Sequence, residues 1–367
     1  MTRWRVALLY NLKHAGTVSP DAPADALADY DTPETVQAVE NALAGAGYEV
    51  FPLEADHTLL DTIRDVNPDI CFNMAKGMNG NERAAQVPAL LEMLNLPYTG
   101  ATVMGHALAM DKSAAKQIWQ ERGLATAPYQ LMFHGDDVLT STLAAELAAA
   151  PLFVKPVHEG SGMGVGPDSL VHNEAELRRR VAWLVDTYQQ PALVEAYLPG
   201  REFSVGILGN RAKPQPRPHY ADPPAAALLP ILELISARTP HNPTTAATDG
   251  AIMLCPATVD SDLQRALSAL ALAAYESIGA LDAARVDLRL DKEGRPMLLE
   301  IDVLPSLDPH SSRFVTMAHC HGLSYTALID RILNLALARH GFKRKHSLPS
   351  IQSDQQTSYS SLRPLSL

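Results

Sequence analysis

Residues 284–302 carry two runs of alternating charged and apolar side chains on either side of a glycine-containing turn. This pattern is typical of a β-hairpin. If the turn centres just before this glycine, Asp287 faces Glu300 across the hairpin. Arg285 then faces Asp302, and all four side chains lie on one face because side chains alternate along a strand. The residues predicted to face the core are Val286, Leu288, Leu299 and Ile301.

The three carboxylates of this hairpin surround a single arginine. Facing carboxylates repel each other across a sheet, so the arrangement predicts a bound cation. Hard oxygen ligands of this kind suit Mg²⁺, which is usually shared with substrate phosphates. Asp287, Glu300 and Asp302 are therefore predicted metal ligands of a metal–nucleotide site. The alternative is an exposed hairpin with ordinary, weak salt bridges, and a slip of one residue would turn the charges into the core.

The first hundred residues alternate strand and helix patterns. Buried strands are predicted at Val6–Tyr10, Tyr48–Leu53 and Asp69–Asn73, and Thr32 with Pro33 predicts the start of a helix between the first two. Strands separated by helices imply a parallel sheet covered on both faces. We therefore expect an α/β domain with an edge near residue 100.

Composition sets broad limits on the function. The chain has 367 residues, of which 47% are apolar and 19% charged, as in an ordinary globular protein of two or three domains. No apolar run is long enough for a membrane span, and no signal peptide is evident. Three scattered cysteines fit no zinc spacing and indicate reduced core residues in a cytoplasmic protein. The net charge of −11 argues against a nucleic-acid surface.

The middle of the chain carries a glycine-rich loop, Glu159–Gly166, after a predicted strand that ends in Lys155. Closely spaced glycines let backbone N–H groups approach phosphate oxygens. The loop lacks the Gly-Lys-Ser/Thr ending of a P-loop, and a flexible linker is the alternative. A long loop at 238–250 is a candidate lid. Candidate nucleotide contacts are Lys112 and Lys155 at element edges, Glu195, Tyr197 and Leu198 as an adenine slot, and Glu202 for a ribose hydroxyl.

In this order and spacing, the segments resemble the ATP-grasp superfamily and, within it, the D-alanine–D-alanine ligases. The resemblance covers about residues 69–338. The matching motifs are Pro97-Tyr98-Thr99-Gly100, Met110-Asp111-Lys112, Phe153-Val154-Lys155-Pro156, Glu159-Gly160-Ser161, Gly200-Arg201-Glu202-Phe203-Ser204-Val205-Gly206, Cys255-Pro256-Ala257, Arg285-Val286-Asp287 and Leu299-Glu300-Ile301-Asp302.

The resemblance implies an ATP-grasp fold in which an N-terminal domain (1–100), a central lid domain (101–197) and a C-terminal catalytic domain (198–342) clamp ATP, with a disordered tail at 343–367. It implies two Mg²⁺ ions, with Mn²⁺ as an alternative, and a possible homodimer. Implied catalytic residues are Arg285, Ser161 and Ser311. Implied nucleotide contacts are Lys112, Lys155, Glu159, Gly160, Ser161, Glu195, Tyr197, Leu198 and Glu202. Implied substrate contacts are Asp31, Glu82, Ser306 and Ser311.

The implied chemistry is carboxylate–amine ligation. A carboxylate attacks the γ-phosphate of ATP to give an acyl phosphate, and an amine then displaces phosphate. Both substrates are small molecules, an acid and an amino acid, with no nucleic acid or membrane involved.

The chain departs from the family mainly around its substrates. The glutamate that holds the first D-alanine is replaced by a longer insertion, in which Asp31 or Glu34 is a possible substitute. Asn73–Glu82 stands where the family has His-Gly-x-x-Gly-Glu, and residues 238–253 lack the lysine and tyrosine of the lid. These departures favour a ligase that joins an amino acid to another small molecule, such as mycosporine-glycine, through an amide or imine-type bond. The alternatives are a true D-alanine–D-alanine ligase, a non-catalytic ATP-binding regulatory protein and another ATP-grasp reaction.

Overall fold

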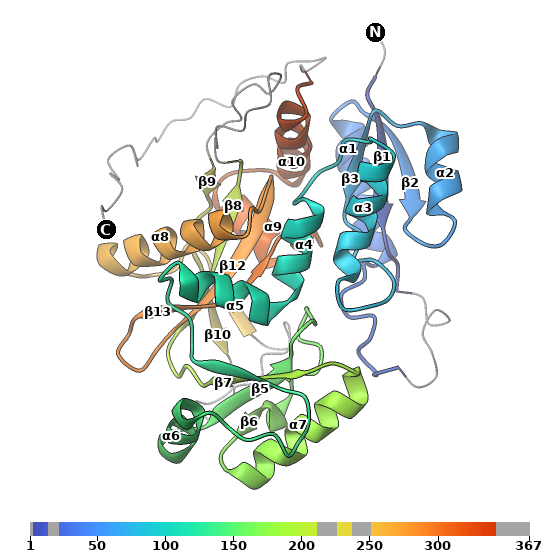
Figure 1. Ribbon diagram of the computed structural model, residues 1–367. Coiled ribbons are helices and arrows are strands. Elements are labelled where there is room, and N and C mark those ends of the chain that lie inside the picture. The colour runs from blue at the N-terminus through green and yellow to red at the C-terminus, as the bar shows by residue number, and fades with distance from the viewer. Residues whose placement is uncertain (1–2, 14–21, 211–225, 237–250, 343–367) are drawn as a thin grey trace.

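The computed structural model describes residues 3–13, 22–210, 226–236 and 251–342. Its strands form three β-sheets, which follow one another along the chain (Figure 1). The predicted lid loop at 238–250 and the predicted tail at 343–367 lie outside the described residues. No helix in the described ranges is long and apolar enough to cross a membrane.

The N-terminal sheet is parallel, with strand order β2-β1-β3, as predicted. Thr32 begins the first helix, because its hydroxyl accepts a hydrogen bond from the Thr35 N–H at 3.2 Å. Alternate residues of β1 pack into two different cores, so both faces of the sheet are covered. The elements are β1 (Arg5–Tyr10), α1 (Pro33–Gly45), β2 (Glu49–Glu54), α2 (Leu59–Val66), β3 (Ile70–Asn73), η1 (Arg83–Ala85) and α3 (Gln86–Met93).

The central sheet is antiparallel, with strand order β4-β7-β5-β6, and helices α6 and α7 pack against it. The strand predicted to end in Lys155 is confirmed and ends one residue later, at Pro156. The elements are β4 (Tyr129–Met132), α6 (Ser141–Ala149), β5 (Leu152–Pro156), η2 (Pro167–Ser169), β6 (Leu170–Val171), α7 (Glu174–Tyr188) and β7 (Ala192–Ala196).

The C-terminal sheet has the order β11-β10-β8-β12-β13, with β9 paired to β8. The predicted hairpin forms its β12–β13 edge. The strands are β8 (Glu202–Leu208), β9 (Ala227–Leu228), β10 (Leu232–Ser236), β11 (Ala251–Leu254), β12 (Ala283–Leu290) and β13 (Pro296–Asp302). The helices of this region are α8 (Ser261–Ser277), α9 (Arg313–Cys320) and α10 (Tyr325–Arg339).

Helices α4 (Val103–Met110) and α5 (Lys112–Glu121) connect the N-terminal and central parts in sequence. They were expected to belong to the central lid domain. In the structure Ala115 and Trp119 of α5 are instead buried in the same core as α8 and the C-terminal sheet. The central sheet is therefore a smaller unit than the predicted 101–197, and it begins after α5.

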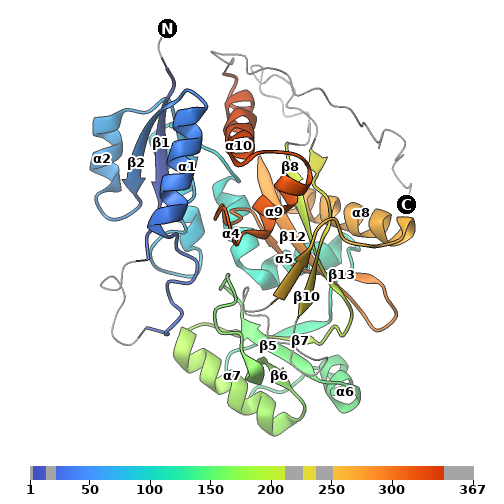
Figure 2. The ribbon, with the colours of Figure 1, turned by 180° about the vertical axis from the view of Figure 1, so that it is seen from behind.

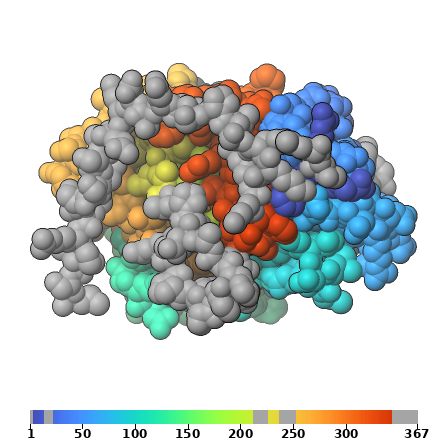
Figure 3. All heavy atoms as spheres, turned by 90° about the horizontal axis from the view of Figure 1, so that it is seen from above, coloured from blue at the N-terminus to red at the C-terminus, as the bar shows by residue number. Residues whose placement is uncertain are grey.

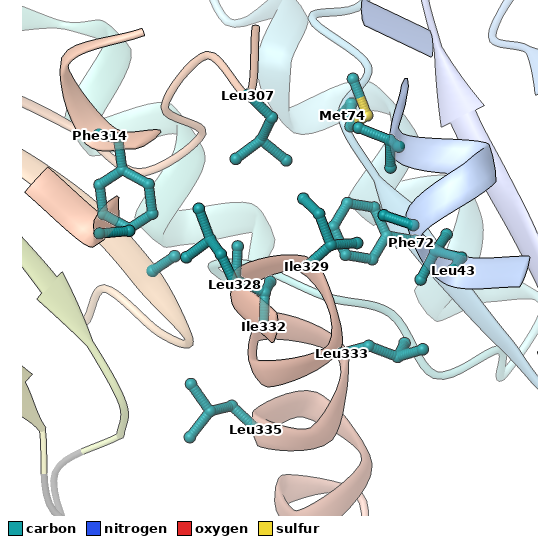
Figure 4. Packing of buried hydrophobic residues seen from close by; sticks show 14 of the residues in the cluster. Leu43, Phe72, Met74, Leu307, Phe314, Leu328, Ile329, Ile332, Leu333 and Leu335 are labelled. Atoms are coloured by element: carbon teal, nitrogen blue, oxygen red, sulfur yellow. The ribbon is translucent and has the colours of Figure 1, made fainter. Parts of the chain in front are cut away.

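One hydrophobic core joins the two ends of the chain. Helix α10 lies between the N-terminal domain and the C-terminal sheet in both ribbon views (Figures 1 and 2). In the close view, Leu43 and Phe72 of the N-terminal domain lie beside Ile329 and Leu333 of α10 (Figure 4). The blue N-terminal and red C-terminal atoms also lie side by side when seen from above (Figure 3). This shared core fixes the N-terminal domain against the C-terminal sheet.

The cysteine prediction is only partly right. Cys71 is buried, but Cys255 is half-buried and Cys320 is exposed. Cys320 lies at the end of α9, where the helix leaves the core, and its thiol donates to the Cys255 carbonyl at 3.1 Å.

Candidate active site

A cleft of about 550 Å³ lies where the three sheets meet. It is lined by all but one of the residues predicted to act: Asp31, Lys112, Lys155, Glu159, Gly160, Ser161, Glu195, Tyr197, Leu198, Glu202, Arg285, Asp287, Glu300, Asp302, Ser306 and Ser311. The exception is Glu82, a predicted substrate contact, which is exposed and is not among the lining residues. Its neighbour Arg83 points to the cleft side instead and pairs with Glu159 at 2.6 Å.

The charged face of the hairpin has the predicted register. Arg285 is opposite Asp302, and Asp287 is opposite Glu300. The Arg285 Nε donates to both carboxylate oxygens of Asp287, at 3.0 and 3.1 Å. Its other nitrogens lie 3.4 Å from Asp302 and 4.0 Å from Glu300. Arg285 thus stands at the centre of the three carboxylates.

The predicted inner face needs one correction. The register shifts after Asp287, so Leu288 pairs with Leu298 rather than with Leu299. Leu298 is fully buried, whereas Leu299 lines the cleft. A β-bulge adds one residue to one strand and re-aims the side chains beside it. The bulge therefore adds an apolar wall next to the carboxylates.

The charges of the square reinforce one another. Burial alone would lower the pKa of Arg285, but Asp287, Asp302 and Glu300 together raise it. Burial alone would raise the pKa of Asp287, but Arg285 and Arg313 together lower it. Ser204 on the neighbouring strand also donates to Asp287 at 2.6 Å. Both groups therefore stay charged at neutral pH.

Within the part of the chain that the structure describes, no three His, Cys, Asp or Glu side chains converge closely enough to hold a metal ion by themselves. The three carboxylates turn toward Arg285 instead. Mg²⁺ commonly takes only one or two protein carboxylates, together with waters and substrate phosphates. Glu300 and Asp302, which are about 30% exposed to the cleft, fit that requirement chemically.

The glycine-rich loop lies opposite the hairpin. Lys112 bridges the two, because its ammonium donates to the Glu159 carbonyl and lies 3.7 Å from Glu300. The Gly164 N–H donates to the Asp25 carboxylate at 2.8 Å, so the loop already holds an anionic group through its backbone. Gly164 has a φ of +68°, and a Cβ there would lie 2.5 Å from Pro156. Only glycine fits this position.

A buried ion-pair triad forms the floor under this loop. Glu195 lies 2.9 Å from Lys116 and 2.7 Å from Lys155, and all three side chains are nearly or fully buried. Burial alone would raise the pKa of Glu195, but the two lysines lower it to about 2. Lys116 was not predicted, although it follows Lys112 by one helical turn and so shares its face.

Two further arginines line the nucleotide side. Arg289 and Arg313 lie 3.7 and 3.6 Å from Glu202. Arg289 also stacks on Tyr197, 5.1 Å from the ring centroid, and donates to its hydroxyl at 3.2 Å. Arg313 lies 3.7 Å from Asp287 as well. Arg289 could have been predicted from strand alternation with Arg285 and Asp287, whereas Arg313 follows an irregular loop that carries no such signal.

Ser306 and Ser311 lie on that loop, which Asp308 organises. The Ser311 N–H and hydroxyl donate to one Asp308 oxygen at 2.6 and 2.9 Å. The other Asp308 oxygen accepts from Thr35 of α1 at 3.0 Å. The loop is thereby attached to the N-terminal domain.

The opposite end of the cleft contains Asp31, Lys76 and His106. Of the two possible glutamate substitutes, Glu34 is exposed and only Asp31 lines the cleft. Burial raises the pKa of Asp31 to about 7 despite nearby Lys76 and Lys13. Burial also lowers the pKa of His106 to about 4, so this histidine is neutral. Neither Lys76 nor His106 was predicted as a site residue.

Comparison with known proteins agrees with this architecture. Residues 118–334 match the family described as D-ala D-ala ligase C-terminus. A D-alanine–D-alanine ligase of Pelotomaculum thermopropionicum is 31% identical, over 85% of this chain and 94% of the relative. An uncharacterized protein of Sinorhizobium fredii is 36% identical, over 82% of this chain and 86% of the relative.

A crystal structure of the Bacillus anthracis D-alanine–D-alanine ligase complexed with ATP superposes with a TM-score of 0.70 at 21% identity, covering 91% of this chain and 97% of that one. Fold and cleft together therefore define an ATP-grasp protein, as predicted. The chain belongs to the D-alanine–D-alanine ligase family of ATP-dependent ligases.

Proposed function

We propose that the protein uses Mg²⁺-bound ATP to convert a small-molecule carboxylate to an acyl phosphate, which the amine of an amino acid then attacks. The observation that carries this proposal is the placement of Arg285, three carboxylates and Lys112 around one cleft, opposite a loop that presents backbone N–H groups. Such a cleft neutralises a transferring phosphoryl group on several sides.

The position of each residue in the cleft assigns its role in the proposed reaction. Tyr197, Leu198 and Glu202 bind the nucleoside, while Lys112, Lys155 and the loop from Glu159 to Ser161 bind the phosphates. Arg285 lies where negative charge develops on the acyl phosphate and on the tetrahedral intermediate. The hydrogen bond to Asp287 holds the Arg285 guanidinium in place, so it can stabilise this developing charge without reorganising its side chain. Ser161, Ser306 and Ser311 orient the two substrates.

Mg²⁺ bound by Glu300, Asp302 and Asp287 together with the phosphates would neutralise charge on the nucleotide. The exposure of Glu300 and Asp302 to the cleft supports this assignment, whereas both oxygens of Asp287 accept hydrogen bonds from Arg285. Mn²⁺ has similar ligand preferences and is expected to substitute.

The acid that we propose is mycosporine-glycine or a similar small molecule. The support is the sequence on the substrate side, where residues 73–82 depart from the His-Gly-x-x-Gly-Glu stretch of the family. The second candidate is a D-alanine–D-alanine ligase, which the named function of the Pelotomaculum relative favours.

Incubation with ATP, Mg²⁺ and pairs of acids and amino acids tests the proposal. ADP and phosphate should form only when both an acid and an amine are present, and an ¹⁸O label in the acid should appear in the released phosphate. ADP formation without an amine, or label that stays in the acid, would contradict an acyl phosphate. Turnover with D-alanine alone would select the second candidate.

A further inference from the structure

The substrate end of the cleft is built by three segments that are distant in sequence. Asp31 precedes α1, Lys76 follows β3, and His106 lies on α4. Lys76 lies just after the carboxyl end of β3, and Asp31 pairs with Leu12 just after the carboxyl end of β1. Ligands of α/β domains usually bind at these ends. Asn11, just after β1, accepts hydrogen bonds from the Lys76 and Gly77 N–H groups at 2.9 and 3.0 Å and so fixes the lysine's backbone.

Two buried groups at this end lack hydrogen-bond partners. His106 is 1% exposed, and neither of its ring nitrogens has a partner among the described residues. Asp31 is 8% exposed, and its Oδ2 also has no partner in the described chain. Buried polar groups in native proteins are normally paired, so each unpaired atom points to a group that binds there.

Lys76 contributes a positive charge to this end, where Lys13, Asp29 and Asp308 also act on Asp31. The Lys76 ammonium donates to the Leu304 carbonyl at 2.6 Å, and no carboxylate of the described residues lies within ion-pair distance. A lysine ammonium can only donate hydrogen bonds, so its remaining protons require oxygen acceptors. Asp31 and His106 both lie within the electrostatic influence of Lys76.

We propose that Asp31, Lys76 and His106 form a binding site for the distal part of the acid substrate, and that this part carries hydroxyl or carboxylate groups rather than a free ammonium group. The inference rests on the proposed ligase function. An ammonium group here would meet Lys76 as a like charge, whereas an oxygen function satisfies the lysine. A hydroxyl group also serves the neutral His106 and the buried Asp31, because it both donates and accepts.

Matched probes separate the two chemistries. Lactate and alanine differ by a hydroxyl in place of an ammonium group, as do glycerate and serine. Binding of each pair, in both enantiomers, is measured by calorimetry on the full chain with Mg²⁺ and a non-hydrolysable ATP analogue. The hydroxy acid of each pair should bind about ten-fold tighter than its amino acid, which is one decade in Kd. Equal or tighter binding of the amino acids would overturn the inference, and so would the absence of binding by both hydroxy acids.

Variants of Lys76 test whether this lysine causes the preference for hydroxy acids over amino acids. Lys76→Met should abolish most of the preference, and Lys76→Glu should reverse it toward the amino acids, a change that a purely structural role would not produce. Lys292→Met, on the exposed hairpin turn, is the control and should keep the preference. A preference that survives in both Lys76 variants, with nucleotide binding intact, would refute the assignment of the lysine.

Different results would contradict the inference and the proposed function. If amino acids serve as acyl donors in amine-dependent ADP release, the ligase function stands and only the inference falls. If no acid of either type supports amine-dependent ADP release, the proposed function fails as well.

Discussion

Replacing Glu195 by glutamine tests the buried triad under the phosphate loop. The substitution keeps the shape of the side chain but leaves Lys116 and Lys155 facing each other without a carboxylate. In the folded protein the two lysines lower the pKa of Glu195 from 4.5 to about 2, against the opposing effect of burial. At about 1.4 kcal/mol per pKa unit, this corresponds to about 3 kcal/mol of stability at neutral pH. Breaking buried ion pairs in other proteins costs about 3–5 kcal/mol, which agrees.

The pH dependence has a definite sign. A carboxylate with a lowered pKa stabilises the fold fully above its ordinary value of 4.5, and this stabilisation is lost as the pH falls toward 2. The difference in unfolding free energy between wild type and Glu195→Gln should therefore be about 3 kcal/mol at pH 7 and less than half of that at pH 3.

Urea denaturation followed by circular dichroism measures this difference. Glu121→Gln is a matched control, because Glu121 is exposed at the end of the helix that carries Lys116, and it should change stability by less than about 0.5 kcal/mol. A loss below about 1 kcal/mol for Glu195→Gln at pH 7, or a loss independent of pH, would refute the argument that the triad stabilises this floor.

Three other changes have clear expectations. Glu300→Gln should keep the melting temperature but lower kcat by about 100-fold or more, because it removes charge next to Lys112 and Arg285. Glu293→Gln on the same hairpin is the control and should leave kcat unchanged. A wild-type kcat for Glu300→Gln would contradict the metal role of Glu300. Asp31→Asn should gain stability over wild type as the pH rises from about 4 to 7, because burial raises the Asp31 pKa to about 7 and its ionisation opposes folding. Urea titrations at several pH values measure the difference in unfolding free energy between the two proteins. A difference that stays constant with pH would contradict the prediction. Gly164→Ala should destabilise the fold by about 1–3 kcal/mol, because of the positive φ and the contact of the added Cβ with Pro156. Gly166→Ala is the control, since a Cβ there meets open space. Equal melting temperatures of the two variants would refute the steric argument.

The hairpin shows how far sequence alone reaches. Its alternation predicted which of Arg285, Asp287, Glu300 and Asp302 face one another, because period-two geometry is local and leaves only the register free. The same reasoning placed Leu299 in the core. A bulge between strands depends on how the hairpin packs against β8 and α8, which no local pattern encodes, so the apolar wall beside the carboxylates could not be predicted.

Tertiary packing also decided the membership of helices α4 and α5. Their sequence follows the N-terminal domain directly, and the domain bounds implied by the resemblance put them in the lid domain. Trp119 instead fills the core beneath α8, where it is fully buried. Lys112 therefore reaches the cleft from the side of the C-terminal sheet, and the region of the central sheet contributes Lys155 and the glycine-rich loop.

The two ends of the cleft differ in how they are assembled. This difference explains why the sequence predicted the residues of the hairpin end but not Lys76 and His106 at the opposite end. The catalytic end is formed largely by one hairpin whose spacing fixes its charges. The substrate end brings Asp31, Lys76 and His106 together only because α10 holds the N-terminal domain against the C-terminal sheet through a common core. Each of these three residues stands alone in its own segment, so no spacing rule connects them. A site assembled in this way can change its ligand through single substitutions that leave the hairpin untouched. We therefore expect the chemistry of activation and the choice of acid to be separable, so that the Lys76 variants alter the second without the first.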